Sequence, residues 1–226
     1  MSNANLDFNK AIGDSKIEGV DIIKDNMEVL LDSVLNEGIL KDIPIIGNLV
    51  GVAKAYGSFR ERFFLKKIIL FLHNVSSVSQ QEKEEFEIKH LTKESDKLRF
   101  YEKLLIILGK CDDLDKADII SSLFLSLIDE KINTHKFIRA VTAVEKVNIE
   151  LLPTLIYRTY SRNSDNAYNI DVENELANCG LLQFQPFHAE NFITRFGEDT
   201  GLRYYINETE IGQIIIRYHN YKRQHR

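Results

Sequence analysis

Histidine and cysteine, the side chains that most often serve catalysis or bind metals, are few and scattered in this sequence. The chain has six histidines and two cysteines. It contains none of the motifs HExxH, CxxC, GxGxxG, GxxxxGK[ST] or GxSxG that would assemble a metal, nucleotide or nucleophile site. Cys111 and Cys179 lie far apart, with no second cysteine or histidine at a metal-ligand spacing. The sequence therefore predicts that the protein is not an enzyme and that it has no catalytic residues, no cofactor and no metal site.

Four aspartates gather where one predicted helix begins, at positions 112, 113, 115 and 118. A calcium-binding loop would also need a central glycine and a terminal glutamate, and this stretch has neither. Negative side chains stabilise the start of a helix because the helix dipole is positive there. We therefore expect these aspartates to cap the helix rather than to bind a metal ion.

A basic and apolar segment, residues 43–72, raises the question of contact with a membrane. Only eleven uncharged residues separate Asp42 from Lys54. A helix that spans the hydrocarbon layer needs about 20 apolar residues, so a simple transmembrane span is excluded. Further along the segment cations outnumber anions, and this charge would attract anionic lipid head groups or another anion. The residues predicted to make such a contact are Arg60, Arg62, Lys66 and Lys67.

The apolar residues of the same segment favour a place inside the protein. On a helical wheel they fall on three arcs that surround the axis, whereas a helix lying on a membrane has one apolar and one polar face. The glycines at positions 47 and 51 form a GxxxG pattern, which permits close helix crossing in protein or in lipid. We expect residues 43–72 to form the middle of a helical core, with a membrane-surface role as the alternative.

The last ten residues, RYHNYKRQHR, interleave cations with two tyrosines. Such a tail can bind single-stranded nucleic acid or an acidic partner, because bases stack on aromatic rings and cations attract acidic groups. The residues predicted for this contact are Lys222, Arg223 and Arg226. The alternative is structural, since cations at the end of a helix are stabilised by its dipole.

Composition and periodicity indicate the elements that carry these residues. An apolar fraction of 44% with only three prolines predicts a folded, mainly α protein. Apolar residues recur every three or four positions in four stretches, and the short loops between the later ones are typical of a helical bundle. The charge-dense residues 80–97 are expected to form a solvated helix or a connector. The four predicted helices are 20–35, 98–108, 114–128 and 134–144.

The expected organisation is a flexible N-terminal arm at 1–16, a helical bundle at 17–148 and a small α+β module at 149–226. The N-terminus lacks a basic region followed by an apolar run, so it is not a secretory signal, and a cytoplasmic location is predicted. The formal net charge of −5 gives no general attraction to nucleic acid.

The C-terminal module resembles the back half of a winged helix-turn-helix domain of bacterial transcription regulators. DVENELANCGLLQF is similar to the second helix of that motif, with Gly180 in the helix-ending position. QFQPF and LRYYI are similar to the strands of the wing, and TEIGQIII, with Thr209 as its cap, is similar to the start of the last helix. The resemblance implies that the helical bundle is followed by a winged-helix-like module.

The helix that would enter the DNA groove in such a domain, residues 171–179, is acidic in its first turns. Regulators normally offer cationic or amide side chains there, whereas this chain has Asp171, Glu173 and Glu175. Carboxylates repel the phosphates of a duplex. We therefore expect the module to contact protein, and we do not expect it to bind duplex DNA through this helix.

A charged helical body that ends in L-x-x-x-G-L-L, a hairpin and TEIG also resembles abortive-infection proteins of the alpha type. That resemblance implies a role in bacterial phage defence. The resulting prediction is a non-enzymatic interaction or adaptor protein in phage defence or a related regulatory system, with a protein as partner. The alternatives are a membrane-active effector that uses residues 43–72 and a nucleic-acid-binding regulator, and an oligomer is compatible with all three.

Overall fold

The computed structural model describes residues 59–160, 170–188, 193–194, 197–198 and 202–224. In these residues the chain is mainly helical, with a small two-stranded antiparallel sheet near the C-terminus. The expected arm at 1–16, the expected helix at 20–35 and residues 43–58 of the apolar segment lie outside the described residues. The helices are α4 (Phe59–Asn74), α5 (Gln80–His90), α6 (Glu94–Lys110), α7 (Leu114–Ile128), α8 (Thr134–Lys146), the short 3-10 helix η2 (Ile149–Leu151), α9 (Leu152–Tyr160), α10 (Ile170–Asn178) and α11 (Glu210–Gln224). The strands are β1 (Leu182–His188), β2 (Ile193–Thr194), β3 (Gly197–Glu198) and β4 (Leu202–Glu208).

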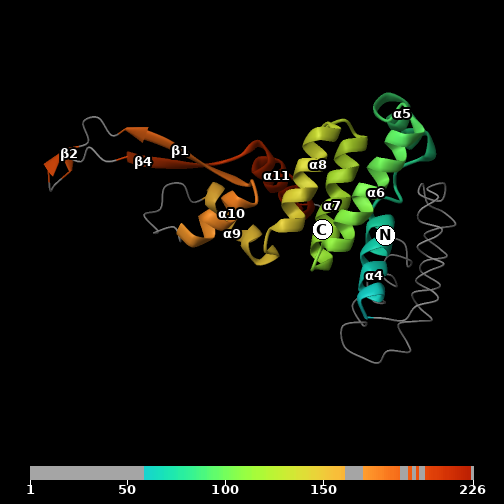
Figure 1. Ribbon diagram of the computed structural model, residues 1–226, viewed down its shortest axis with the longest axis horizontal. Coiled ribbons are helices and arrows are strands. Elements are labelled where there is room, and N and C mark those ends of the chain that lie inside the picture. The colour runs from blue at the N-terminus through green and yellow to red at the C-terminus, as the bar shows by residue number, and fades with distance from the viewer. Residues whose placement is uncertain (1–58, 161–169, 189–192, 195–196, 199–201, 225–226) are drawn as a thin grey trace. The chain divides into compact units, whose positions relative to one another are not determined.

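The chain divides into two compact units, which we call unit 1 (Met1–Thr134) and unit 2 (His135–Arg226). Among the described elements, unit 1 holds α4 to α7, and unit 2 holds the strands and the helices from α8, which begins at the boundary, to α11 (Figure 1). The boundary expected from the sequence lay after residue 148. In the structure, the boundary between the two units lies at the start of α8 instead, so α8 belongs to unit 2.

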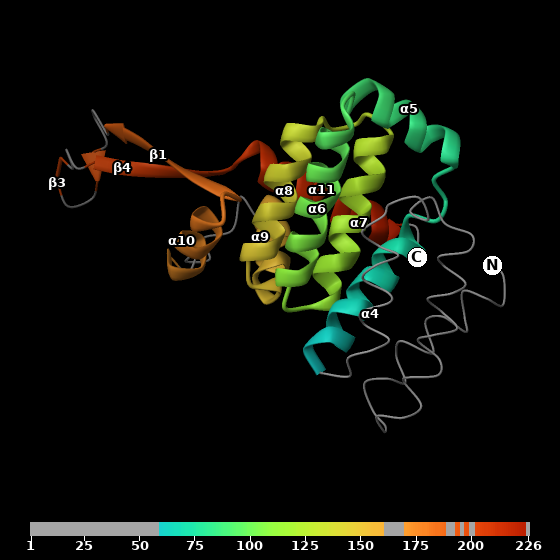
Figure 2. The same ribbon diagram turned by 45° about the vertical axis from the view of Figure 1, so that its right-hand side comes forward.

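In unit 1, α4 packs against α7 and α6, and Figure 2 shows these three helices side by side. Phe71 of α4 meets Phe124 of α7 edge to face, with the ring centroids 5.4 Å apart, which is a favoured aromatic geometry. The prediction that the apolar segment forms core is confirmed for its described part. The buried apolar residues of α4 are Leu65, Ile68, Ile69, Phe71 and Leu72.

The charge-dense stretch 80–97 forms α5 and the start of α6, with a buried face that the sequence did not predict. α5 opens with a capping box: the Ser79 side chain accepts from the Glu82 amide, and the Glu82 carboxylate accepts from the Ser79 amide at 2.7 Å. Phe86 turns inward toward Phe100 of α6, with the ring centroids 5.9 Å apart. One aromatic residue among many charges gives no periodic apolar pattern, so this face was not recognised.

The helices predicted at 98–108, 114–128 and 134–144 are confirmed as α6, α7 and α8. Most of the apolar residues that predicted them are buried, and Leu98, which is 44% exposed, is an exception. α7 begins as expected from its aspartates, because the Asp113 side chain accepts from the Asp115 amide at 2.7 Å and caps the helix.

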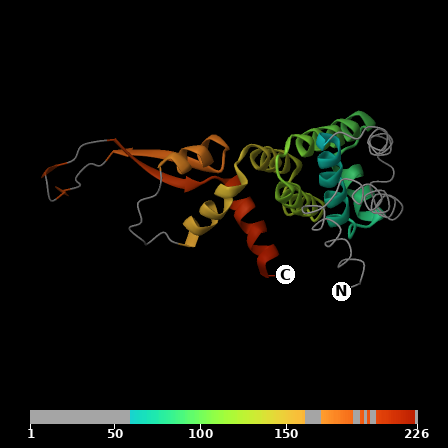
Figure 3. The same cartoon turned by 90° about the horizontal axis from the view of Figure 1, so that it is seen from below.

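Unit 2 ends in a hairpin and a final helix. β1 and β4 pair antiparallel, from Leu182 opposite Glu208 to His188 opposite Leu202, which confirms the two predicted strands. β2 and β3 form a second, very short antiparallel pair. α10 packs beside β1, as the orange helix and strand in Figure 3 show. The C-terminal part of this mainly helical chain is therefore α+β.

The residues that end α10 make a close backbone contact with the start of α11. α10 ends in a Schellman motif, with Gly180 at a φ of 79° and the Leu181 amide donating to the Leu176 carbonyl at 2.9 Å. The Thr209 hydroxyl donates to the Gly180 carbonyl at 2.6 Å and accepts from the Gly212 amide at 3.0 Å. A Cβ atom at Gly212 would lie 2.2 Å from the Leu181 carbonyl oxygen. The predicted helix end at Gly180 and cap at Thr209 are confirmed. The close backbone contact also requires the glycine at 212.

Candidate functional site

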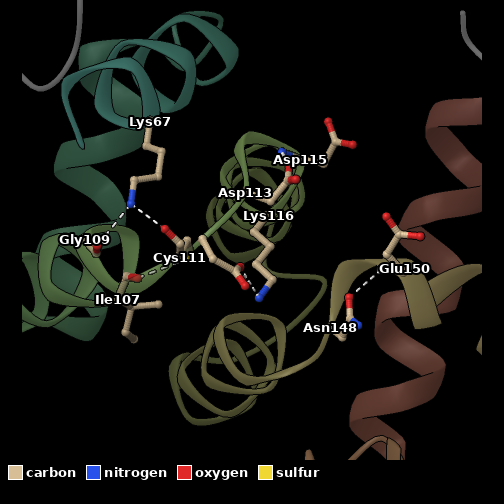
Figure 4. A network of polar contacts seen from close by, with 10 residues as sticks. Lys67, Ile107, Gly109, Cys111, Asp113, Asp115, Lys116, Asn148 and Glu150 are labelled. Atoms are coloured by element: carbon tan, nitrogen blue, oxygen red, sulfur yellow. Dashed lines mark hydrogen bonds and ion pairs between the residues drawn. The ribbon is translucent and has the colours of Figure 1, made fainter. Parts of the chain in front are cut away.

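Lys67, one of the cations predicted to meet an anion or a membrane, points into unit 1. Its ammonium group donates to the Cys111 carbonyl at 2.6 Å and to the Gly109 carbonyl at 3.0 Å (Figure 4). It also lies 5.0 Å from the centroid of the Phe63 ring, which is a favourable cation–π position. Only 1% of the residue is exposed. Lys67 therefore satisfies the carbonyl groups that α6 leaves without helical partners at its C-terminal end.

Burial affects the charge of this lysine. It lowers the pKa of Lys67 below its ordinary value, and the nearby Cys111 and Asp112 partly oppose the change. A buried ammonium group is costly unless it is hydrogen-bonded, and the two carbonyl oxygens supply those bonds. The physical role of Lys67 in this structure is to join α4 to α6.

The other predicted cations of this segment are placed differently. Arg60 is exposed at the start of α4, Lys66 is half-buried, and the side chain of Arg62 lies outside the described atoms. Burial lowers the pKa of Lys66 as well. Of the predicted lipid or anion contacts whose side chains are described, Arg60 is thus the most accessible and Lys67 is not accessible at all.

A second buried polar cluster centres on Glu87 of α5. The Tyr101 hydroxyl of α6 donates to Glu87 Oε1 at 2.6 Å, and the Lys97 ammonium lies 3.2 Å from Glu87 Oε2. The Lys83 ammonium, one helical turn before Glu87, lies 3.8 Å from Oε1. Burial raises the pKa of Tyr101 above its ordinary value, and the hydrogen bond to Glu87 acts in the same direction. Tyr101 therefore stays protonated as a donor, and the cluster links α5 to α6.

This cluster is hard to recognise in the sequence because Glu87 lies among many other charged residues. The only distinguishing signal is its spacing: Lys83, Phe86 and Glu87 occupy neighbouring positions on one side of α5 and are all buried.

The aspartates around the start of α7 serve separate structural contacts. Asp112 pairs at 2.6 Å with Lys116, which is 1% exposed, and the hydrogen bond to Lys116 is the main cause that lowers the pKa of Asp112. Asp118 accepts from the Asn74 side chain of α4 at 2.8 Å. Within the ranges that the structure describes, no three histidine, cysteine, aspartate or glutamate side chains come together as a metal site.

The acidic helix of unit 2 keeps two of its three predicted carboxylates at the surface. Asp171 and Glu175 are exposed on α10, whereas Glu173 is only 5% exposed. Among the predicted basic contacts of the tail, Lys222 and Arg223 lie in α11 with side chains outside the described atoms, and Arg226 lies outside the described residues.

An isoleucine surrounded by acids lies on the surface of α5. Ile88 is 73% exposed. Glu84 and Glu85 precede it by four and three residues, so they are its neighbours on the helix, and both are exposed. Gln81 lies one turn further back and donates to Glu85 at 2.8 Å. We call Gln81, Glu84, Glu85 and Ile88 the acidic patch.

An isoleucine with an excess of cations at helical spacing lies on the surface of α6. Ile106 is 58% exposed. Lys103 precedes it by three residues, Lys110 follows it by four, Arg99 lies two turns before it, and all three cations are exposed. We call Arg99, Lys103, Ile106 and Lys110 the basic patch. Sequence reasoning missed both patches, although each has a signal: an isoleucine flanked at helical spacing by an excess of charges of one sign.

The described helices include none that is both long and apolar enough to cross a membrane. Comparisons of the chain with protein-family models, curated proteins and solved structures gave no match. The resemblances to winged-helix domains and to abortive-infection proteins of the alpha type therefore rest on the sequence motifs alone.

Proposed function

We propose that this chain is a non-enzymatic interaction protein, an adaptor that binds protein in the bacterial cytoplasm and serves phage defence or a related regulatory system. The observation that supports the proposal is how the described side chains are used. The buried charges of Lys67 and Glu87 join helices within unit 1, whereas Ile88 and Ile106 remain exposed among charged residues. An apolar centre with a polar rim is the usual composition of a protein–protein interface.

The C-terminal unit fits this proposal as a winged-helix-like contact module. α10, β1, β4 and α11 follow one another in the order that the motif resemblance implies. Asp171 and Glu175 on the surface of α10 would repel the phosphates of a duplex, but they can pair with cations of a protein. The defence context comes from the sequence resemblance to abortive-infection proteins.

Affinity purification from the source host tests the proposal. The tagged chain is expected to recover a protein in a fixed molar ratio, either a different gene product or an untagged second copy. Charge reversal in a patch, Glu84→Lys or Lys103→Glu, should reduce that recovery, because like charges across an interface repel. Lys146→Glu, which reverses an exposed lysine of unit 2, is the control. A solitary chain, or recovery that all three variants leave unchanged, would contradict the proposal.

A further inference from the structure

The acidic and basic patches are alike in form and opposite in charge. A single exposed isoleucine is common on protein surfaces and needs no explanation. Here Ile88 and Ile106 are, in that order, the two most exposed large apolar side chains of the described residues, and both belong to unit 1. One has carboxylates at helical-neighbour positions and the other has ammonium groups there.

Neighbouring charges leave this contrast in place. Lys89, which follows Ile88, is paired at 2.6 Å with Glu130, which lies in the turn after α7. Glu102 is the one acid at a neighbouring position on the basic side, four residues before Ile106. The basic patch therefore keeps an excess of cations, and the acidic patch keeps an excess of carboxylates.

The two patches do not cover each other within one unit. α5 and α6 are connected by a short turn, but Ile88 and Ile106 are both largely exposed in the same structure. A surface that is complementary to another surface of the same molecule, yet is not in contact with it, can be satisfied by a second copy.

We propose that the acidic patch of one copy binds the basic patch of a second copy of this chain. In a two-fold arrangement the contact forms twice, with α5 of each copy against α6 of the other. The isoleucines contact apolar surface at the centre, and the charges around them pair across the interface and exclude wrong registers. Patches of the same sign repel, so the contact is between unlike patches. This inference rests on the proposed function and names its partner.

Sedimentation velocity on the full chain tests the proposal, over a range of concentrations and at low and high salt. The wild-type chain is expected to show a concentration-dependent dimer that weakens with added salt, because exposed charge pairs are screened. Glu84→Lys alone and Lys103→Glu alone should each weaken dimerisation by at least about tenfold, since each places like charges opposite one another. Lys146→Glu should dimerise like the wild type.

An equal mixture of the two patch variants gives the sharpest result. In the mixed dimer, the α6 that carries Lys103→Glu faces the α5 that carries Glu84→Lys, so unlike charges meet again. The second contact keeps its natural charges. The mixture should therefore regain wild-type dimerisation, although neither variant dimerises well alone. Circular dichroism of each variant establishes that the fold is retained, and the mixture distinguishes lost charge pairing from lost folding.

Three outcomes overturn the inference: a wild-type chain that stays monomeric at every concentration in low salt, single variants that dimerise as well as the wild type, and a mixture no better than its components. The proposed function fails separately. A monomeric chain that still recovers a different protein through these patches contradicts the second-copy partner and leaves the interaction role standing, whereas recovery of no protein contradicts both.

Discussion

Around the apolar core of unit 1, the buried polar contacts between helices come from long charged side chains, whereas in unit 2 a glycine and short polar groups connect α10, β1 and α11. In unit 1, Lys67 reaches from α4 to the last carbonyls of α6, and Glu87 of α5 receives the Tyr101 hydroxyl. In unit 2, the Leu181 carbonyl lies where a side chain of residue 212 would begin. A long side chain can adjust and depends on its charge, but a backbone contact leaves no room for adjustment.

The largest loss of stability is expected at the close backbone contact between Leu181 and Gly212 in unit 2. Gly212→Ala places a Cβ atom 2.2 Å from the Leu181 oxygen, so the start of α11 or the end of α10 must move. The cost should be about 2–4 kcal/mol of unfolding free energy, measured by urea denaturation. Gln213→Ala, at the exposed neighbouring position, should change stability by less than about 0.5 kcal/mol. Equal stability of the two variants would contradict the steric account.

The second-largest loss of stability is expected at the hydrogen bonds of Lys67 in unit 1. Lys67→Met keeps most of the apolar stem but leaves the Cys111 and Gly109 carbonyls without the ammonium donor, and buried acceptors without partners cost about 2 kcal/mol. Lys146→Met removes an exposed ammonium group outside both patches and should change the unfolding free energy by less than about 0.5 kcal/mol. If both variants unfold at the same urea concentration, the capping role of Lys67 is wrong.

The contribution of Lys67 to the unfolding free energy should depend on pH because burial lowers the pKa of Lys67. Below that lowered pKa, the folded and unfolded chains both bind the proton, so this group adds no pH dependence. Between it and the ordinary lysine value of about 10.4, the unfolded chain binds more protons, and stability rises with pH. The difference in unfolding free energy between the wild type and Lys67→Met should therefore grow through this alkaline window. A difference that is flat or falls there contradicts the pKa direction.

A smaller effect is expected at the link between α5 and α6. Tyr101→Phe removes the hydroxyl that donates to Glu87 and should cost about 1–2 kcal/mol. A double-mutant cycle with Glu87→Leu, which removes the acceptor, isolates the bond, and the coupling free energy should be about 1 kcal/mol. Strictly additive effects of the two substitutions would show that the tyrosine and the carboxylate act independently.

Sequence reasoning succeeded where the apolar pattern alone decides the element. α7 was predicted at its observed ends because Ala117, Ile120 and Leu127 recur at helical spacing and are buried. The hairpin strands and the cap at Thr209 were predicted from residue types that favour those positions. The core position of Leu65 and its neighbours followed from apolar residues on all sides of α4.

The buried polar contacts that connect the helices were not predictable in the same way. The acceptors of Lys67 are two backbone carbonyls more than 40 residues away, and every residue has such a carbonyl, so nothing in the sequence marks the pair. Lysine on a basic segment instead suggested an exposed anion contact. Glu87 was hidden by its charged neighbours for a related reason: burial of one carboxylate depends on Tyr101 and Lys97 from the next helix.

Hydrogen exchange of α4 tests the central structural claim, that the described part of the apolar segment, residues 59–72, is core and is not a membrane-binding surface. Peptides covering Leu65 to Leu72 should exchange slowly in solution, and anionic phosphatidylserine vesicles should leave their exchange unchanged, because the side chains are already buried against α6 and α7. Rapid exchange in solution that slows when the vesicles are added would contradict the account.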